Sequence, residues 1–376
     1  MQVNRVLLVL VALGLAAGIG PAFLSAAPNR LMAGTAIPLI AVARGPHLLA
    51  LLPALVLLAG PFLPQRRAIH VLIAASGAVF LLTVLWLAGV AAADLAGHAP
   101  LRPGIARISL GGGFWLLFLC AVLALLDALQ RLRLAPTSRL LVAAALLTVI
   151  ALLAASGAFD QLALAKEYAA RRDAFASALF RHAAIVLAAL TPTVVLGTPL
   201  GVLAARHARL RAALFPILNI VQTVPSIALF GLLIAPLSAL GIGGIGAAPA
   251  IIALFLYALL PIVRNTAEGV DGVPSAVIDA ARGMGMTRSQ ILWRVELPLA
   301  LPVLLSGLRI ATVQTVGLAA VAALIGAGGL GAIMFEGLFA DALDLVLLGA
   351  VPVILLALAA ETLFAAASAA ARRVPA

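Results

Sequence analysis

Few side chains in this sequence could do covalent chemistry, and none is grouped for it. Lys166 is the only lysine and has no glycine near it, so it cannot complete a phosphate-binding loop ending in Gly-Lys-Ser/Thr. Cys120, the only cysteine, lies in an apolar run and can form neither an internal disulfide nor a cysteine-based metal site alone. The histidines are scattered, without a carboxylate-bearing i, i+4 pair. We therefore expect no catalytic residue, no bound cofactor and no metal in this chain.

Polar residues interrupt apolar segments at two places, and they are the candidates for a path through a membrane. Polar side chains inside a span usually face the bundle interior or a water-filled path, although they also join helices by hydrogen bonds. A further pair at the end of a run, Arg264 and Asn265, either caps the helix and anchors it at the interface or forms an inner gate. The interrupting residues are Gln222, Thr223, Pro225 and Ser226, and then Thr312, Gln314 and Thr315.

A glycine-rich stretch, residues 326–331, superficially resembles a phosphate loop. No lysine follows it, and a lone run of glycines is weak evidence for a nucleotide site. It lies at the outer end of an apolar run, so we predict a helix break or tight turn that could contact an extracytoplasmic partner.

The composition shows what kind of scaffold must position these residues. Of 376 residues, 65% are hydrophobic and 10% are charged, whereas soluble domains carry about 25% charged residues. This excludes a soluble enzyme, a disordered tail and a nucleic-acid-binding domain. A spanning helix needs about 20 apolar residues, so the sequence predicts an all-α polytopic membrane protein.

Ten apolar runs can each cross a bilayer. They lack period-2 alternation, so helices are expected rather than strands. The first follows Arg5 and ends near 25–27, which also fits a cleavable signal peptide, although its length favours a retained helix. Residues 28–44 are semi-apolar and are expected to form a short interfacial or re-entrant piece. The runs are 6–24, 46–64, 68–93, 112–130, 138–158, 182–205, 212–240, 248–263, 299–325 and 343–366.

The distribution of arginine predicts the orientation. With the N-terminus inside, 16 of the 24 Lys and Arg residues fall in inner segments and 8 in outer segments. This count includes Arg30 and Arg102 outside and Arg372 and Arg373 inside. Cationic residues collect on the cytoplasmic side, so both termini are predicted to be cytoplasmic.

Two long connections divide the chain. The mixed-charge segment 159–181 separates five helices from five, which predicts a domain boundary between 1–175 and 176–376. The other, 264–298, is the longest cytoplasmic loop. Within it, Pro274 and Ser275 mark a helix start over 276–283, and Gly283 and Gly285 its end. A second short helix is expected over 287–296, after which Leu297 and Pro298 return the chain to the membrane.

This loop resembles the cytoplasmic signature of ABC importer permeases, Glu-Ala-Ala, three residues, Gly, nine residues, Ile-x-Leu-Pro. All spacings hold, and two positions depart from the signature, Asp279 in place of Glu and Val295 in place of Ile. In that family the loop is a coupling helix that docks on a separate ATPase subunit. The resemblance implies that the ATPase-coupling residues are Asp279, Ala280, Ala281, Arg282, Gly283, Gly285, Val295, Leu297 and Pro298.

Residues 178–366 also resemble a more specific group, the binding-protein-dependent type I permeases of the glycine betaine/choline/carnitine uptake family. The similarity lies in 222–229, 249–266 and 323–331. It implies a five-helix type I permease core, with an added N-terminal block that looks like a subgroup of the family. It also implies ATP-Mg on partner ATPase subunits, a second permease chain, the same or homologous, an extracytoplasmic binding protein and a bacterial inner membrane. The implied function is osmoprotectant import by alternating access.

Three alternatives differ in what they require. A permease of the same type for methionine, sulfonate or another small solute is the nearest. A stand-alone secondary carrier is disfavoured by the coupling signature and by the absence of acidic residues near the middle of the runs, since proton-driven carriers need ionisable groups at membrane depth. A membrane enzyme would need a nucleophile or acid/base group, and the sequence offers no such set.

Overall fold

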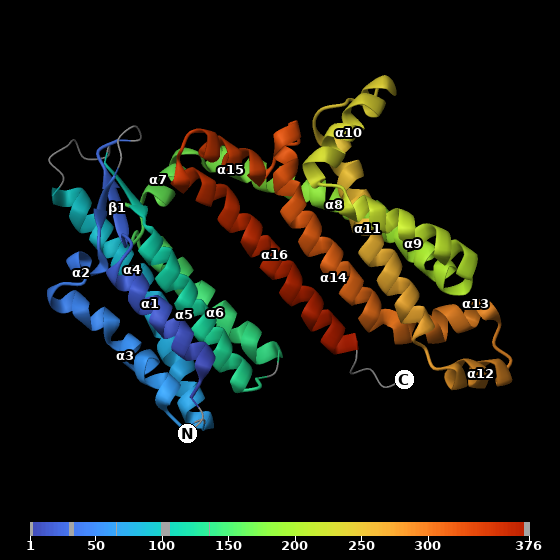
Figure 1. The fold of residues 1–376 in the computed structure, drawn as a ribbon, viewed down its shortest axis with the longest axis horizontal. Helices are drawn as coiled ribbons and strands as arrows, with labels where there is room; N and C mark the ends of the chain where they lie inside the picture. The colour runs from blue at the N-terminus through green and yellow to red at the C-terminus, as the bar shows by residue number, and fades with distance from the viewer. Residues whose placement is uncertain (1–2, 30–33, 65, 99–105, 135, 372–376) are drawn as a thin grey trace. The chain divides into compact units, whose positions relative to one another are not determined.

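The computed structural model describes residues 3–29, 34–64, 66–98, 106–134 and 136–371. The chain forms two compact units, Met1–Ala170 and Arg171–Ala376 (Figure 1). Arg30, Arg102, Arg372 and Arg373, which contribute to the predicted orientation, lie outside the described residues.

The N-terminal unit is built mainly from apolar helices of unequal length. Its longest, α4, runs over 32 residues, about 48 Å at 1.5 Å per residue. The elements are α1 (Arg5–Ile19), β1 (Leu24–Ala27), β2 (Thr35–Ile37), α2 (Leu39–Val42), η1 (Gly45–Leu51), α3 (Leu52–Ala59), η2 (Gly60–Phe62), α4 (Arg67–His98), β3 (Arg107–Leu110), α5 (Gly112–Arg131), α6 (Pro136–Ala155) and α7 (Ala163–Ala170).

The C-terminal unit packs long helices around α11, which is buried against α8 and α14. Small residues make this packing close. A Cβ on Gly201 of α8 would meet the Thr266 Cβ at 2.5 Å, and one on Gly307 of α14 would meet the Asn265 Cβ at 2.6 Å. The elements are α8 (Arg172–Arg206), α9 (Ala208–Thr223), α10 (Ser226–Ala239), α11 (Ala247–Asp271), α12 (Ser275–Gly283), α13 (Arg288–Ile291), the π-helix η3 (Leu292–Glu296), α14 (Leu297–Val321), η4 (Ala322–Ile325), α15 (Leu330–Phe339) and α16 (Leu343–Ala371).

The predicted polytopic helical architecture is confirmed, with differences in the span count. Among the described residues, eight helices are long and apolar enough to cross a membrane, or nine if the bent pair α9 and α10 counts as one span. The first predicted run, 6–24, yields only the 15-residue α1, because Gly20 and Pro21 end the helix before Leu24 enters a strand. The ten apolar runs are thus all largely helical, but not all are full spans.

Three short antiparallel strands are a feature that the prediction of an all-α fold did not include. Their order is β2-β1-β3, with Leu24 opposite both Ile37 and Leu110. The end of the first apolar run and part of the 28–44 segment therefore form sheet rather than a purely helical or re-entrant piece. Strands of three or four residues are too short to show a periodicity that distinguishes them from helix.

The start of α1 is fixed in the N-terminal unit by a polar cluster. Asn4 is buried, and its side-chain oxygen caps Leu7 N–H at 3.2 Å while its amide donates to Asp127 of α5 at 2.9 Å. Arg131 bonds both side chains, at 2.9 Å to Asn4 and 2.8 Å to Asp127. A fully paired cluster of this kind makes α1 an integral part of the unit.

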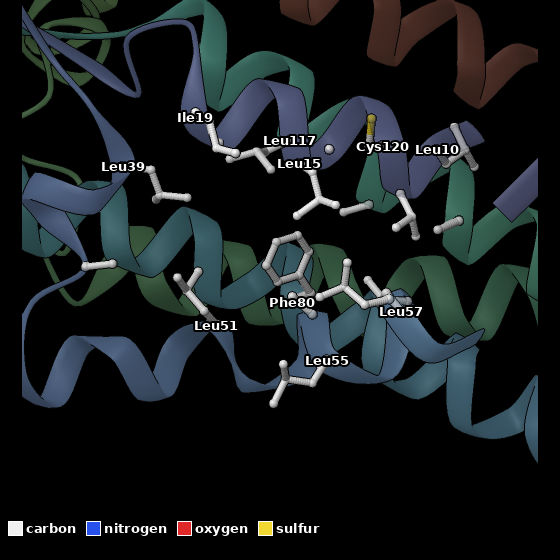
Figure 2. Close-up of a pocket in the computed structure, with 18 of the residues that line it drawn as sticks. Leu10, Leu15, Ile19, Leu39, Leu51, Leu55, Leu57, Phe80, Leu117 and Cys120 are labelled. Atoms are coloured by element: carbon white, nitrogen blue, oxygen red, sulfur yellow. The ribbon is translucent and has the colours of Figure 1, made fainter. Parts of the chain in front are cut away.

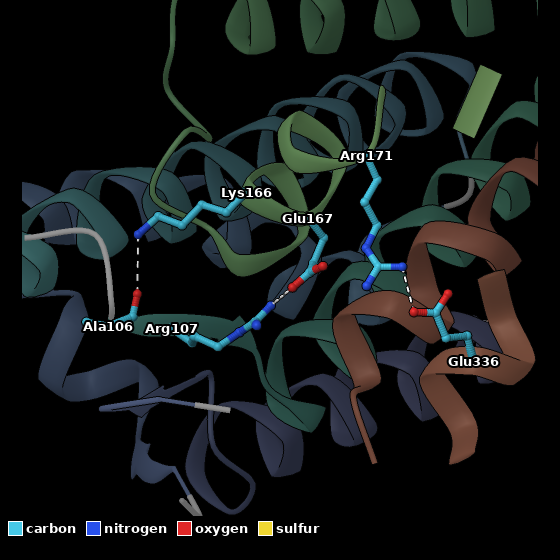
Figure 3. Close-up of polar contacts among 6 residues, drawn as sticks. All are labelled: Ala106, Arg107, Lys166, Glu167, Arg171 and Glu336. Carbon is cyan, nitrogen blue, oxygen red and sulfur yellow. Dashed lines mark hydrogen bonds and ion pairs between the residues drawn. The ribbon is translucent and has the colours of Figure 1, made fainter. Parts of the chain in front are cut away.

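A second polar cluster lies at α7 (Figure 3). Arg107 on β3 forms an ion pair with the buried Glu167, and Lys166 donates to the Ala106 carbonyl at 3.3 Å. Burial, and then the nearby positive charge of Arg107, lower the pKa of Lys166.

In the C-terminal unit, Arg171 pairs with Glu336 of α15 at 2.6 Å.

Candidate functional site: the coupling segment and the broken helix

The coupling segment, residues 272–298, begins with a short helix that has a well-formed C-terminal cap. The Met286 N–H donates to the Ala281 carbonyl at 3.2 Å and the Gly285 N–H to the Arg282 carbonyl at 2.9 Å. Gly285 has φ +79°, so the end of α12 is a Schellman motif with glycine at its left-handed position. The prediction that the helix ends at Gly285 is confirmed. The expected Ser275 cap is wrong, because Pro274 is the N-cap and its side chain makes no cap bond.

The faces of α12 separate its two alanines. Ala281 is only 2% exposed, whereas Ala280 is exposed. Apolar side chains also point outward from the segment, with Met284 75% and Trp293 68% exposed. Asp279 and Arg282 pair with one another at 3.0 Å on the exposed surface. Exposed apolar groups with charged neighbours are typical of a protein-docking surface.

The second part of the segment is continuous with the next span, which corrects the predicted separate helix over 287–296. A Thr287–Gln290 capping box starts α13, and the helix then passes through the π-turn η3 into α14. Pro298 has no N–H for an α-helical bond, and the wider turn accommodates it, with Leu297 N–H bonding the Leu292 carbonyl. Val295, Leu297 and Pro298 therefore lie along a single helical element rather than at a turn.

Glu296 joins this element to α8. Glu296 is 7% exposed, and its carboxylate accepts a 2.5 Å bond from Arg206, the last residue of α8. The sequence reading did not single out Glu296, although its place between two motif positions was a signal. The pair ties the end of one span to the coupling segment, so a displacement of that segment acts directly on α8.

The break between α9 and α10 is held by side-chain hydrogen bonds between α9 and α11. Pro225 ends α9, and α10 leaves at 106°. In α11, Pro261 has no N–H to donate to the Tyr257 carbonyl. The Gln222 amide donates to that carbonyl at 2.5 Å, while the Tyr257 hydroxyl donates to the Val224 carbonyl at the break. Each helix thus satisfies a carbonyl of the other, which the membrane interior requires.

The other residues predicted to line the path make fewer contacts with neighbouring helices. Gln314 of α14 donates to the Gln222 side chain at 3.4 Å. Thr223 and Pro225 are exposed, Ser226 is half-buried, and Thr312 and Thr315 bond the carbonyls of their own helix. The bonds bring Gln222 and Gln314 together with Tyr257, which sequence reasoning missed, whereas a path lined by these residues stays a prediction.

Arg264 and Asn265 lie within α11 rather than at its end, because the helix continues to Asp271. Arg264 is exposed and pairs with Glu268 at 3.4 Å, and Asn265 bonds the Pro261 carbonyl of its own helix at 2.8 Å. Neither contact joins the two to the Gln222 cluster.

The glycine-rich stretch forms the predicted turn, between η4 and α15. Gly326, Gly328 and Gly329 have φ of +79°, +81° and +77°, which L side chains rarely adopt. The turn packs on α8, where Arg181 donates to the Ala327 carbonyl at 3.0 Å and the buried His182 lies against Gly329.

Gln222 offers a test of the cluster at the break. A Gln222→Ala variant removes the donor to the Tyr257 carbonyl, so we expect unfolding to become easier by about 1 kcal/mol, the size of an interhelical bond in membranes. Solute uptake should fall severalfold. The matched control is Thr223→Ala, whose hydroxyl bonds only its own helix. Unfolding in mixed detergent micelles and uptake in vesicles measure both effects; equal behaviour of the two variants would contradict the assignment.

Within the part of the chain that the structure describes, no three His, Cys, Asp or Glu side chains come together as a metal site. What the geometry defines is an exposed coupling surface and a helix break that is hydrogen-bonded to α11.

Two family models match the chain. Residues 197–373 match "binding-protein-dependent transport system inner membrane component", and residues 4–165 match "ABC transporter permease YehY, N-terminal domain". The second match assigns a family to the half of the chain in which no motif is readable.

Several curated proteins are similar over the C-terminal half. The osmoprotectant import permease protein OsmW of Salmonella typhimurium is 44% identical over 50% of this chain and 87% of its own length. The carnitine transport permease protein OpuCB of Listeria monocytogenes is 42% identical over 48% of this chain and 81% of its own length. A chain in a solved structure of the MetNI methionine ABC transporter shares 27% identity over 52% of this chain and 97% of that chain, with a TM-score of 0.46.

The fold and the coupling segment define an integral membrane transport component. The chain belongs to the family of binding-protein-dependent transport system inner membrane components and is a permease of the ABC importer class.

Proposed function

We propose that this permease imports osmoprotectants such as glycine betaine, carnitine or choline. The support is the identity of 39–44% to permeases named for these solutes, over about half of this chain and most of each relative's length. The N-terminal block, 1–175, is proposed as an addition to the importer core, 176–376.

The observation that carries the mechanism is the coupling segment. It offers exposed Met284 and Trp293 with the Asp279–Arg282 pair on a glycine-capped helix, and it continues rigidly into α14. We infer that an ATPase subunit binds this surface in the cytoplasm, where the predicted orientation puts it. ATP and Mg²⁺ act on that subunit, and this chain binds no cofactor itself.

Transport then follows from alternating access. The chain has one coupling segment, so a complete importer needs two permease chains, identical or homologous, and two ATPase subunits. ATP binding closes the ATPases and moves both coupling segments, and through Arg206–Glu296 and α14 the motion reaches the spans. A binding protein delivers solute at the outer face, and hydrolysis restores the inward-facing state.

Uptake of radiolabelled glycine betaine into proteoliposomes tests the proposal. The vesicles hold this chain with its ATPase and binding protein, with ATP inside or absent. We expect ATP-dependent uptake that choline or carnitine reduces. Uptake of methionine or a sulfonate instead would overturn the solute assignment but keep the mechanism. Uptake without ATP or ATPase would indicate a stand-alone carrier.

A further inference from the structure

An apolar cavity of about 480 Å³ lies inside the N-terminal unit. Its walls come from α1, α2, η1, α3, α4 and α5, and Figure 2 shows Leu15 of α1, Phe80 of α4 and Leu55 of α3 among the lining side chains. Every lining residue is apolar, with the Cys120 thiol as the most polar group. A cavity without hydrogen-bonding partners does not hold ordered water, but it can bind an apolar molecule. Its size lies in the range of ligand pockets, roughly 300–1,000 Å³.

Two glycines of α1 create the space. Gly14 and Gly18 form a G-x-x-x-G pair, a pattern that usually brings two helices into close contact. Here a Cβ on Gly14 would meet only the Cys120 Cβ at 3.9 Å, and one on Gly18 only a Leu39 methyl at 3.4 Å. Both are ordinary contacts with side chains. The glycine face of α1 therefore lies against the cavity instead of against a neighbouring backbone.

The cavity is open toward the apolar surface of the unit. Several lining side chains are themselves exposed in the unit, among them Leu15, Ile19, Ile40 and Leu55. These residues belong to apolar helical runs of a membrane protein, so hydrocarbon chains of lipid are the molecules that meet this opening.

Positive charge lies at one end of the same path. A second hollow, lined by Arg5, Val6, Val9 and Leu10, shares Leu10 with the cavity. Arg5 is exposed and, among the described residues, has no ion-pair partner, unlike Arg131, which is bound to Asp127. Guanidinium groups bind phosphate oxygens well, and basic sites at the cytoplasmic ends of spans bind anionic lipid headgroups.

Two more arginines lie at this end of the unit. The Asn4 N–H donates to the Pro61 carbonyl of η2 at 3.0 Å, which holds the start of α1 beside η2. Arg66 and Arg67 follow η2 at the start of α4, and both are exposed. The end of the cavity path therefore carries a cluster of cations suited to a phosphodiester.

We propose that the N-terminal unit binds one anionic phospholipid, with an acyl chain in the cavity and its phosphate at Arg5. The hollow beside Val6 and Val9 leads the chain from the headgroup to the cavity. The site suits a phospholipid because it combines a long apolar volume with the positive charge of Arg5 at this end of the path.

Native mass spectrometry of the full-length chain tests the site. The chain is reconstituted in nanodiscs with equal amounts of phosphatidylethanolamine and phosphatidylglycerol and then released stepwise into detergent. The wild type should keep one phospholipid, enriched in phosphatidylglycerol. A Gly14→Leu/Gly18→Leu variant fills the cavity and should lose bound lipid at least tenfold. Ala12→Leu/Ala16→Leu is the matched control, since these exposed residues of α1 do not line the cavity.

A headgroup variant separates the two halves of the site. Arg5→Gln should keep the retained lipid but lose the preference for phosphatidylglycerol, whereas Arg139→Gln, an exposed arginine of α6 away from the path, should keep it. Full lipid retention by the double glycine variant would overturn the proposal. So would a retained mass that is not a phospholipid, or no retained lipid in the wild type.

Discussion

A Gly285→Glu variant is expected to insert normally and to lose ATP-dependent uptake by two orders of magnitude or more. Gly285 is the left-handed residue of the α12 cap, with φ +79°, and an L side chain there costs roughly 1–2 kcal/mol. A Cβ at this position meets nothing within 4 Å in the chain itself. The new carboxylate therefore points away from the permease, into the surface beside Met284 where we place the ATPase.

Two further substitutions at the same position separate strain from lost docking. Asn tolerates the left-handed conformation, so Gly285→Asn should retain most uptake, and Gly285→Ala, which is strained but small, should lie between. ATPase co-purification and uptake in vesicles are the measurements. Normal ATP-dependent uptake by Gly285→Glu would show that the coupling segment does not dock through α12.

The second large effect is expected at Gly331. A Cβ there would lie 1.9 Å from the Ala320 carbonyl oxygen and 2.7 Å from the carbonyl carbon. With any side chain at position 331, α15 can therefore pack on α14 only if the backbone shifts. Overpacking of this kind typically costs 1–3 kcal/mol, and occasionally more. We expect Gly331→Ala to lower the thermal unfolding midpoint in detergent by several degrees and to reduce uptake strongly.

Gly317→Ala is the control for this effect. Gly317 lies on α14, and an added Cβ meets nothing within 4 Å. Both changes replace a helical glycine with alanine, so the main difference between them is the contact of the new Cβ with Ala320. Equal midpoints for the two variants would contradict the tight packing of α15 on α14.

Local signals in the sequence were sufficient for much of the site. Gly285 as a helix end, the break at Pro225 and the turn of glycines at 326–329 each depend on the backbone chemistry of one or two residues, and all three are present. The helical architecture follows from apolar runs that must satisfy their own hydrogen bonds.

The features that the sequence did not predict depend on residues far apart in the chain or on elements too short to show a hydrophobic periodicity. The Gln222–Tyr257 bond joins residues 35 positions apart, and it arises because Pro261 frees a carbonyl that a side chain of a neighbouring helix can reach. Pro298 was expected to begin a new segment, yet a π-turn carries the helix through it. The strand at 24–27 is too short and too apolar to be distinguished from the run before it.

The crossed bonds between the α9–α10 break and α11 bear on how the permease moves. A sharp bend in a span is commonly regarded as a hinge, but here the end of α9 and Val224 in the break are fastened to α11 through Gln222 and Tyr257. Moving the end of α9 away from α11 would strip two carbonyls of their donors. The end of α9 and α11 are therefore expected to tilt as one body between the inward and outward states, and any flexing at the break falls between Val224 and the start of α10.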